Sequence, residues 1–171
     1  MSQRRLTKGN ETEPVMSAFL NYAKASPDSY RAMLQLSQYT HHLELEPALL
    51  ELVRVRASQI NHCAYCIDMH TLDARAAGET EQRLYAVAAW EEAPFFTPRE
   101  RAALAWTEAV TRLADRPVPE TLYRATLEQF SEQEIVDLTL AIIAINGWNR
   151  LAGVFRTEAG HYRPASRAKS A

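Results

Sequence analysis

The sequence of 171 residues predicts one compact, all-α bundle of about six to eight helices. Apolar residues recur at three- and four-residue spacing in nearly every long segment, as they do on the buried face of a helix. Two segments, 97–100 and 131–134, show the Ser/Thr-to-Glu pattern of a helix capping box. No segment shows the strict alternation of a strand. We therefore predict a helical domain over 14–155, between a polar arm at 1–13 and a polar tail at 156–171.

The first half of the domain is expected to hold four helices. A short helix over 15–25 is followed by one over 27–42, which starts at a proline. A third helix, 47–60, is apolar around most of its circumference, so we expect it to be buried. A fourth, 63–77, ends at Gly78, because glycine readily takes the left-handed conformation just past a helix C-terminus.

Three charged residues interrupt the apolar third helix: Glu51, Arg54 and Arg56. A charge on an otherwise apolar helix needs a partner or a task, because burying it alone is costly. We expect Arg54 and Arg56 to face solvent or a subunit contact. Glu51 is a candidate for a task at a functional site.

The second half of the domain is expected to hold four more helices, over 81–90, 98–114, 121–130 and 132–149. The last of these carries the most apolar run, so we expect it to be the most buried helix. The tail beyond it is polar and Arg-rich, and we expect it to be loosely held.

The composition is that of an ordinary soluble protein, with 47% hydrophobic residues and a formal charge of −2. Nothing in this balance favours a nucleic-acid partner. No apolar run approaches the roughly 18 to 20 residues that cross a bilayer, and the first five residues lead into no apolar signal region. We expect a cytoplasmic protein that does not bind membranes.

The segment 62–70 carries the most reactive side chains of the chain, including both of its cysteines. On a helix, Cys63, Cys66 and His70 occupy one face at positions i, i+3 and i+7. A helix N-terminus and a nearby imidazole both lower a thiol pKa and so increase the reactive thiolate. Such a pair forms a reversible disulfide, or a sulfenic acid that the second thiol resolves.

Other interpretations of this segment remain open. His62, Cys63, Cys66 and His70 are all zinc-ligand types, although structural zinc sites usually join two separated pairs. Haem attachment requires histidine directly after the second cysteine, where Ile67 stands, and a thioredoxin module requires a βαβ setting. The two cysteines could also be small core residues. We expect no metal and no cofactor.

The spacing of these residues is similar to a known pattern. Glu51, then Cys63-Ala64-Tyr65-Cys66 after eleven residues, then His70 after three more, resembles the active site of the alkyl hydroperoxidase D-like (AhpD-like) proteins. These proteins form part of the carboxymuconolactone decarboxylase superfamily. The resemblance extends less sharply over 45–150.

The resemblance implies an all-helical AhpD-like fold and a homo-oligomer, a trimer or a hexamer. It implies that Cys66 is the attacking thiolate, that Cys63 closes the disulfide, and that His70 and Glu51 relay the proton from Cys66. Tyr65 stands where the best-studied subgroup has histidine, and tyrosine hydrogen-bonds but does not shuttle protons near neutral pH.

The hypothesis from the sequence is therefore a thiol peroxidase that reduces hydroperoxides through Cys66 and Cys63, aided by His70, Glu51 and Tyr65. Its partners would be a small hydroperoxide and a dithiol reductant, which the resemblance implies is a lipoylated protein or a peroxiredoxin-type partner. Two alternatives are a redox-sensing or structural oligomer, and a decarboxylase-like enzyme with a non-peroxide substrate. The sequence does not decide the physiological substrate or reductant.

Overall fold

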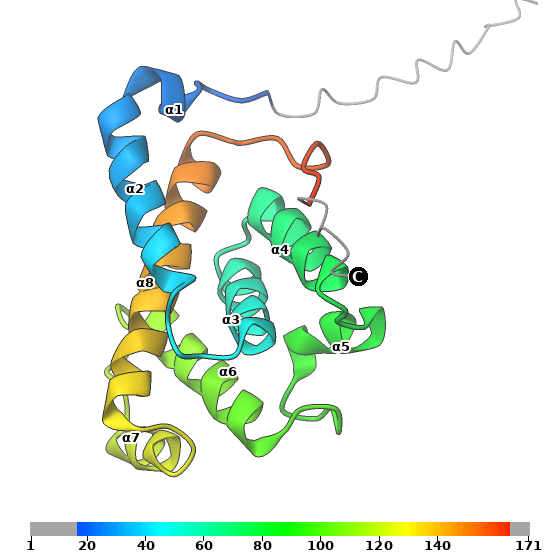
Figure 1. Cartoon of the computed structure of the whole chain (residues 1–171), viewed down its shortest axis with the longest axis vertical. Coiled ribbons are helices and arrows are strands. Elements are labelled where there is room, and N and C mark those ends of the chain that lie inside the picture. The colour runs from blue at the N-terminus through cyan, green and yellow to red at the C-terminus, as the bar shows by residue number, and fades with distance from the viewer. Residues whose placement is uncertain (1–16, 165–171) are drawn as a thin grey trace, which may run out of the picture.

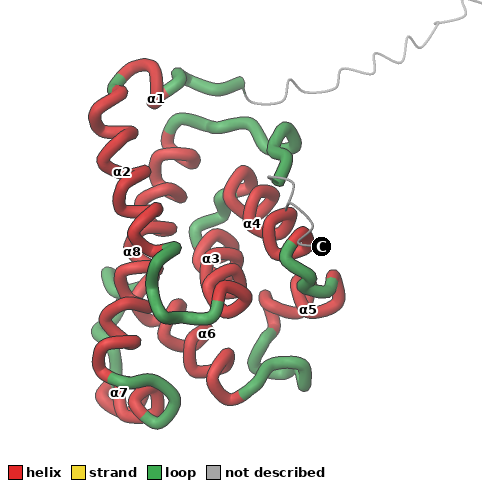
Figure 2. Tube along the Cα trace, in the orientation of Figure 1, coloured by secondary structure: helices red, strands yellow, loops and turns green. Residues whose placement is uncertain are grey.

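The structure, a computed structural model, describes residues 17–164, and every regular element within that range is a helix (Figures 1 and 2). The all-α prediction is confirmed. The elements in chain order are α1 (Tyr22–Ala25), α2 (Pro27–Thr40), α3 (Pro47–Ile60), α4 (Ala64–Ala76), α5 (Glu81–Ala86), the 3-10 helix η1 (Val87–Ala89), α6 (Pro98–Thr111), α7 (Glu120–Leu127) and α8 (Glu132–Val154).

Helix α3 lies at the centre of the domain. It packs against α4, α6, α8 and η1, while α2 runs alongside α8 on one side of the molecule (Figure 1). Apolar residues lie on all sides of α3, and Leu52, Val53 and Val55 are at most 1% exposed. A helix with that pattern has no polar face to turn toward water, so its neighbours must cover it on every side.

Two large core clusters meet on α3, and a small third cluster lies beside the cysteines. The first joins α3 to α6 and α8, and the second joins α3 to α4, α5, η1 and α6. The third cluster consists of Ala57, Cys63, Cys66, Ile145 and Ala152. Both cysteines are therefore part of packed structure between α3, α4 and α8.

The predicted helix ends are present. Thr97 and Glu100 form a reciprocal capping box at the start of α6, and Ser131 and Glu134 form another at the start of α8. Gly78 follows α4 with a φ of 103°, a conformation that favours glycine. These local signals position the two helices that flank α3.

Two segments near the start and the middle of the chain differ from the sequence-based expectation, and α8 runs five residues past the expected end at 149. The first helix is confined to Tyr22–Ala25, because the backbone N–H of Phe19 donates to the carbonyl of Phe155 and holds the preceding residues outside a helix. Residues 15 and 16 lie outside the described range. The helix predicted over 81–90 is divided into α5 and η1.

The tail is also held more firmly than expected. The backbone N–H of Gly160 donates to Asp68 at 2.8 Å, and the Tyr162 hydroxyl donates to Asp73 at 2.8 Å. Both acceptors belong to α4, so the described part of the tail is docked on the cysteine helix.

Helix α8 is not the most buried helix, since Val136 and Ile143 are 68% and 50% exposed. Among the described residues it is the one helix long and apolar enough to cross a membrane by length and composition, which corrects the expectation that no segment qualifies. Leu138 and Ile142 on its inner face are completely buried in the first core cluster, so this face of α8 packs inside the domain.

Candidate active site

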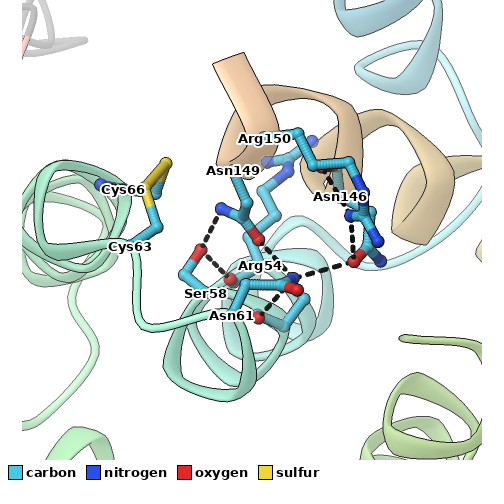
Figure 3. The surroundings of a disulfide bond; sticks show 9 residues. Arg54, Ser58, Asn61, Cys63, Cys66, Asn146, Asn149 and Arg150 are labelled. Carbon is cyan, nitrogen blue, oxygen red and sulfur yellow. Dashed lines mark hydrogen bonds between the residues drawn. A yellow bond between two sulfur atoms is a disulfide. The ribbon is translucent and has the colours of Figure 1, made fainter. Parts of the chain in front are cut away.

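The turn between α3 and α4 places both cysteines beside α8. The Asn61 side-chain amide donates to Asn149 Oδ1 at 2.9 Å and to Asn146 Oδ1 at 2.8 Å (Figure 3). The carbonyl of Ser58 accepts from the Cys63 backbone N–H at 3.0 Å. Hydrogen bonds to α3 and to α8 thus hold the turn in place.

Cys63 and Cys66 form a disulfide with their Cα atoms 5.4 Å apart (Figure 3). Cys63 is the N-cap residue of α4, and its sulfur accepts from the Cys66 backbone N–H at 3.3 Å. Cys66 lies in the first turn of the helix, so both cysteines are at the helix end whose backbone N–H groups have no partner within the helix. The partial positive charge of this helix end favours a thiolate over a thiol.

Cys66 lines a cavity of about 280 Å³ between α2, α3, α4 and α8. Glu51 and His70 line the same cavity, so the structure brings together the predicted attacking cysteine and the two residues of the predicted relay. Much of the remaining wall is aromatic and comes from Tyr22, Tyr30, Tyr65, Trp148 and Tyr162. The cavity therefore combines a few polar groups with a largely apolar surface.

His70 is held by Glu51. The Nδ1 atom of His70 and Oε2 of Glu51 are 2.9 Å apart, and the two side chains are only 10% and 14% exposed. A carboxylate on one ring nitrogen favours the tautomer that carries the proton there. The Nε2 atom of His70 then has a free lone pair and can act as a base within the cavity.

Arg54 is the second partner of Glu51, which corrects the expectation that Arg54 faces solvent. It is 7% exposed, and its Nη1 lies 2.5 Å from Oε1 of Glu51. Its Nη2 donates to the Thr40 hydroxyl at 3.4 Å. Arg56 is likewise half-buried and pairs with Glu108 at 2.6 Å. The charges on α3 are therefore paired inside the domain.

Glu51 is ionised in this arrangement. Burial alone would raise its pKa, but the hydrogen bond from His70 and the charges of His70 and Arg54 outweigh burial and lower the pKa below its ordinary value. The cavity also holds His41, whose pKa is lowered by burial and by the nearby Arg54. The Glu51 carboxylate is thus held between the His70 ring and the Arg54 guanidinium.

Tyr65, the first-turn neighbour of Cys66, is partly buried and packs on the third core cluster beside the cysteines. Its pKa is raised by burial and by the neighbouring Tyr30 and Asp68. A hydroxyl with a raised pKa is a weaker acid, so Tyr65 is a poor proton donor at neutral pH.

The four candidate zinc ligands do not point to one place. His70 lines the cavity of Cys66, whereas His62 lines a separate cavity beside Cys63, and the two sulfurs are bonded to each other. Within residues 17–164, no group of three or more His, Cys, Asp or Glu side chains is arranged to hold a metal ion.

Comparison with known proteins identifies a family that matches the part of the chain holding this site. The carboxymuconolactone decarboxylase family matches residues 27–109, which include Glu51, both cysteines and His70. The uncharacterized protein YdfG of Bacillus subtilis is 42% identical over 137 residues, which cover 80% of this chain and 93% of YdfG.

Solved structures share the fold. A protein of unknown function from Agrobacterium tumefaciens, for which an antioxidant-defence role as AhpD has been suggested, is 40% identical with a TM-score of 0.83. That match covers 85% of this chain and 100% of the other. An uncharacterized peroxidase-related protein from Ralstonia eutropha, described as an alkylhydroperoxidase AhpD core, has a TM-score of 0.73 at 22% identity, covering 82% and 75% of the two chains.

Proposed function

Since the chain belongs to the carboxymuconolactone decarboxylase family as an AhpD-like member, we propose that it is a thiol peroxidase that reduces organic hydroperoxides with Cys66 and Cys63. One observation carries this proposal. Cys66 shares a cavity with His70, whose Nδ1 is engaged by the Glu51 carboxylate. A thiol and an oriented base in one enclosed space are the components of an activated nucleophile.

The first step is attack of the Cys66 thiolate on the terminal oxygen of the hydroperoxide. His70 takes the thiol proton and returns it to the departing alkoxide, so an alcohol leaves and Cys66 becomes a sulfenic acid. Glu51 holds the His70 ring and stabilises its protonated form, and Arg54 keeps Glu51 ionised.

The second step closes the disulfide. The Cys63 thiol loses its proton and attacks the Cys66 sulfur, the oxygen leaves as water, and the bond seen in the structure forms. Each cycle oxidises the two thiols by two electrons, which an external dithiol must restore. We propose a lipoylated protein or a peroxiredoxin-type partner as this reductant, and a trimer or hexamer as the assembled form.

The direct test is the stoichiometry of the reaction with cumene hydroperoxide. Fully reduced protein is expected to consume one equivalent and then stop, with one disulfide formed per chain. Adding dihydrolipoamide is expected to restore continuous consumption. Reduced protein that consumes no peroxide above the rate of a free thiol would overturn the proposal.

Tyr65 is expected to act by position rather than by proton transfer. Its raised pKa makes the hydroxyl a weak acid, so Tyr65→Phe should change the rate constant of peroxide reduction by less than about threefold. Tyr65→Ala, which also removes an aromatic ring from the cavity wall, should have the larger effect. A loss of more than about thirtyfold in Tyr65→Phe would assign the hydroxyl a role in proton transfer.

A further inference from the structure

Each cysteine of the disulfide lines a cavity of its own. Cys66 lines the first cavity and Cys63 does not, whereas Cys63 lines a second cavity of about 490 Å³ and Cys66 does not. Tyr65 and Ala152 belong to both linings and form the partition. Both sulfurs are nearly inaccessible from outside, with Cys63 3% and Cys66 1% exposed, so a reagent must enter one cavity or the other.

Two residues that line the second cavity have an unusual backbone conformation. Within residues 17–164, the non-glycine residues with positive φ are His62 and Arg156, each with a φ of 53°, and both line this cavity. Such a conformation costs about 1–3 kcal/mol and persists where surrounding structure imposes it. The Arg156 guanidinium is held 4.0 Å from the centre of the Phe19 ring. Strain of this kind concentrates at functional sites.

We propose that the second cavity is the entrance for the dithiol reductant, which attacks the disulfide at Cys63, while the hydroperoxide uses the first cavity. This proposal rests on the redox cycle proposed above and adds to it the site, the point of attack and the separation of the two substrates. The lining includes the small residues Ala64, Ala152, Gly153 and Ala159, together with polar and charged side chains from His62, Arg156, Thr157, Glu158 and His161. Ala152 packs with Cys63 in the third core cluster, so small side chains beside this cysteine leave room for the narrow end of a dithiol arm.

The reaction balances as two thiol–disulfide exchanges. A thiolate of the dithiol bonds to the Cys63 sulfur, the Cys63–Cys66 bond breaks, and Cys66 leaves as a thiolate that His70 can protonate. The second thiol of the reductant, once deprotonated, then attacks its own sulfur in the mixed disulfide. Cys63 leaves as a thiolate and is protonated, and the reductant departs as a cyclic disulfide. Two electrons pass from the dithiol to the protein.

The chemistry of the leaving group favours the same direction of attack. In thiol–disulfide exchange the sulfur with the lower thiol pKa leaves faster. Cys66 shares its cavity with the His70 base, whereas Cys63 lies outside that cavity. Attack at Cys63 therefore releases Cys66, the cysteine that shares its cavity with the His70 base, and regenerates the peroxide-reactive group directly.

The point of attack can be located on the wild-type protein. Protein oxidised with diamide is mixed with 2-mercaptoethanol, quenched with N-ethylmaleimide within the first turnover, and digested. Fragmentation between the two cysteines then shows which one carries the mixed disulfide. We expect the 2-mercaptoethanol adduct on Cys63 and maleimide on Cys66. The reverse distribution would overturn the proposal.

The entrance itself can be closed at Gly153, where an added Cβ meets no atom within 4 Å. Gly153→Trp is expected to slow reduction of the diamide-formed disulfide by dihydrolipoamide by at least about tenfold, whereas Gly153→Ala should stay within about twofold of wild type. Circular dichroism verifies the fold of both variants. Reduction of Gly153→Trp at the wild-type rate would place the reductant elsewhere. Neither experiment uses peroxide, so failure of the peroxidase assignment is detected separately.

Discussion

Cys66→Ser is expected to abolish peroxide reduction, and Cys63→Ser to permit one round and then stop. A serine hydroxyl is not ionised near neutral pH, so the Cys66→Ser rate constant should fall by at least about a thousandfold. Cys63→Ser retains the attacking thiolate in the first cavity but has no second thiol to close the disulfide. Its sulfenic acid should therefore accumulate.

The two variants serve as controls for each other, because each replaces one sulfur by one oxygen on the same turn of α4. The measurement is rapid-mixing consumption of cumene hydroperoxide, with a dimedone adduct detected by mass spectrometry as the record of sulfenic acid. Multiple turnover by Cys66→Ser would refute the assignment of the nucleophile. If Cys66→Ser forms the adduct and Cys63→Ser does not, the two roles are exchanged.

Glu51→Ala is expected to have the largest effect on stability. The variant leaves Arg54, whose side chain is 8% exposed, without its carboxylate partner. Removing one member of a buried ion pair costs about 3–5 kcal/mol of unfolding free energy, because the remaining charge stays buried. Urea unfolding measures this loss.

A double variant separates the effect of Glu51 on stability from its effect on the proposed proton relay. Glu51→Gln combined with Arg54→Met removes both charges and is expected to recover most of the lost unfolding free energy, since neutral replacement of a buried pair is often nearly neutral. Peroxide reduction should not recover, because His70 then lacks its carboxylate. A double variant as unstable as Glu51→Ala would show that an unpaired Arg54 is not the cause.

The pH dependence of the unfolding free energy is a second test of the Glu51–Arg54 ion pair. The pKa of Glu51 is lower in the folded protein than its ordinary value of 4.5, so the carboxylate stabilises the fold above that value. This contribution disappears as the pH falls through the folded-state pKa. The difference in unfolding free energy between wild type and Glu51→Gln should therefore be largest near pH 7 and shrink in acid. A difference that stays constant down to pH 3 would contradict the ion-pair assignment.

Most of the fold could be predicted because helix starts and helix ends are determined by residues close together in the sequence. The capping boxes at Thr97 and Ser131 and the glycine at Gly78 depend on neighbours within a few residues, and all three end or begin helices as expected. The short α1 was not predictable in this way. It depends on a backbone hydrogen bond between Phe19 and Phe155, which are far apart in the sequence.

In the candidate site, too, local arrangements could be predicted from the sequence and tertiary contacts could not. Cys63, Cys66 and His70 lie in the N-terminal part of the same helix, so their spacing in the sequence was enough to predict that they are close together. Glu51 was assigned to the site from the resemblance to the AhpD-like proteins, because its contact with His70 is a tertiary contact between α3 and α4. Arg54 was wrongly expected at the surface, although its position three residues after Glu51 on an apolar helix was a usable signal. The partition between two cavities depends on α8 and the tail, which no local pattern reports.

The pKa of the Cys66 thiol shows whether the fold makes this cysteine an activated thiolate. Cys63→Ser leaves Cys66 as the sole thiol of the chain, so the pH dependence of its alkylation by iodoacetamide reports that group alone. We expect a pKa well below the free value of about 8.5, and a rise toward that value when His70→Ala is added. An ordinary pKa that His70→Ala leaves unchanged would contradict the account.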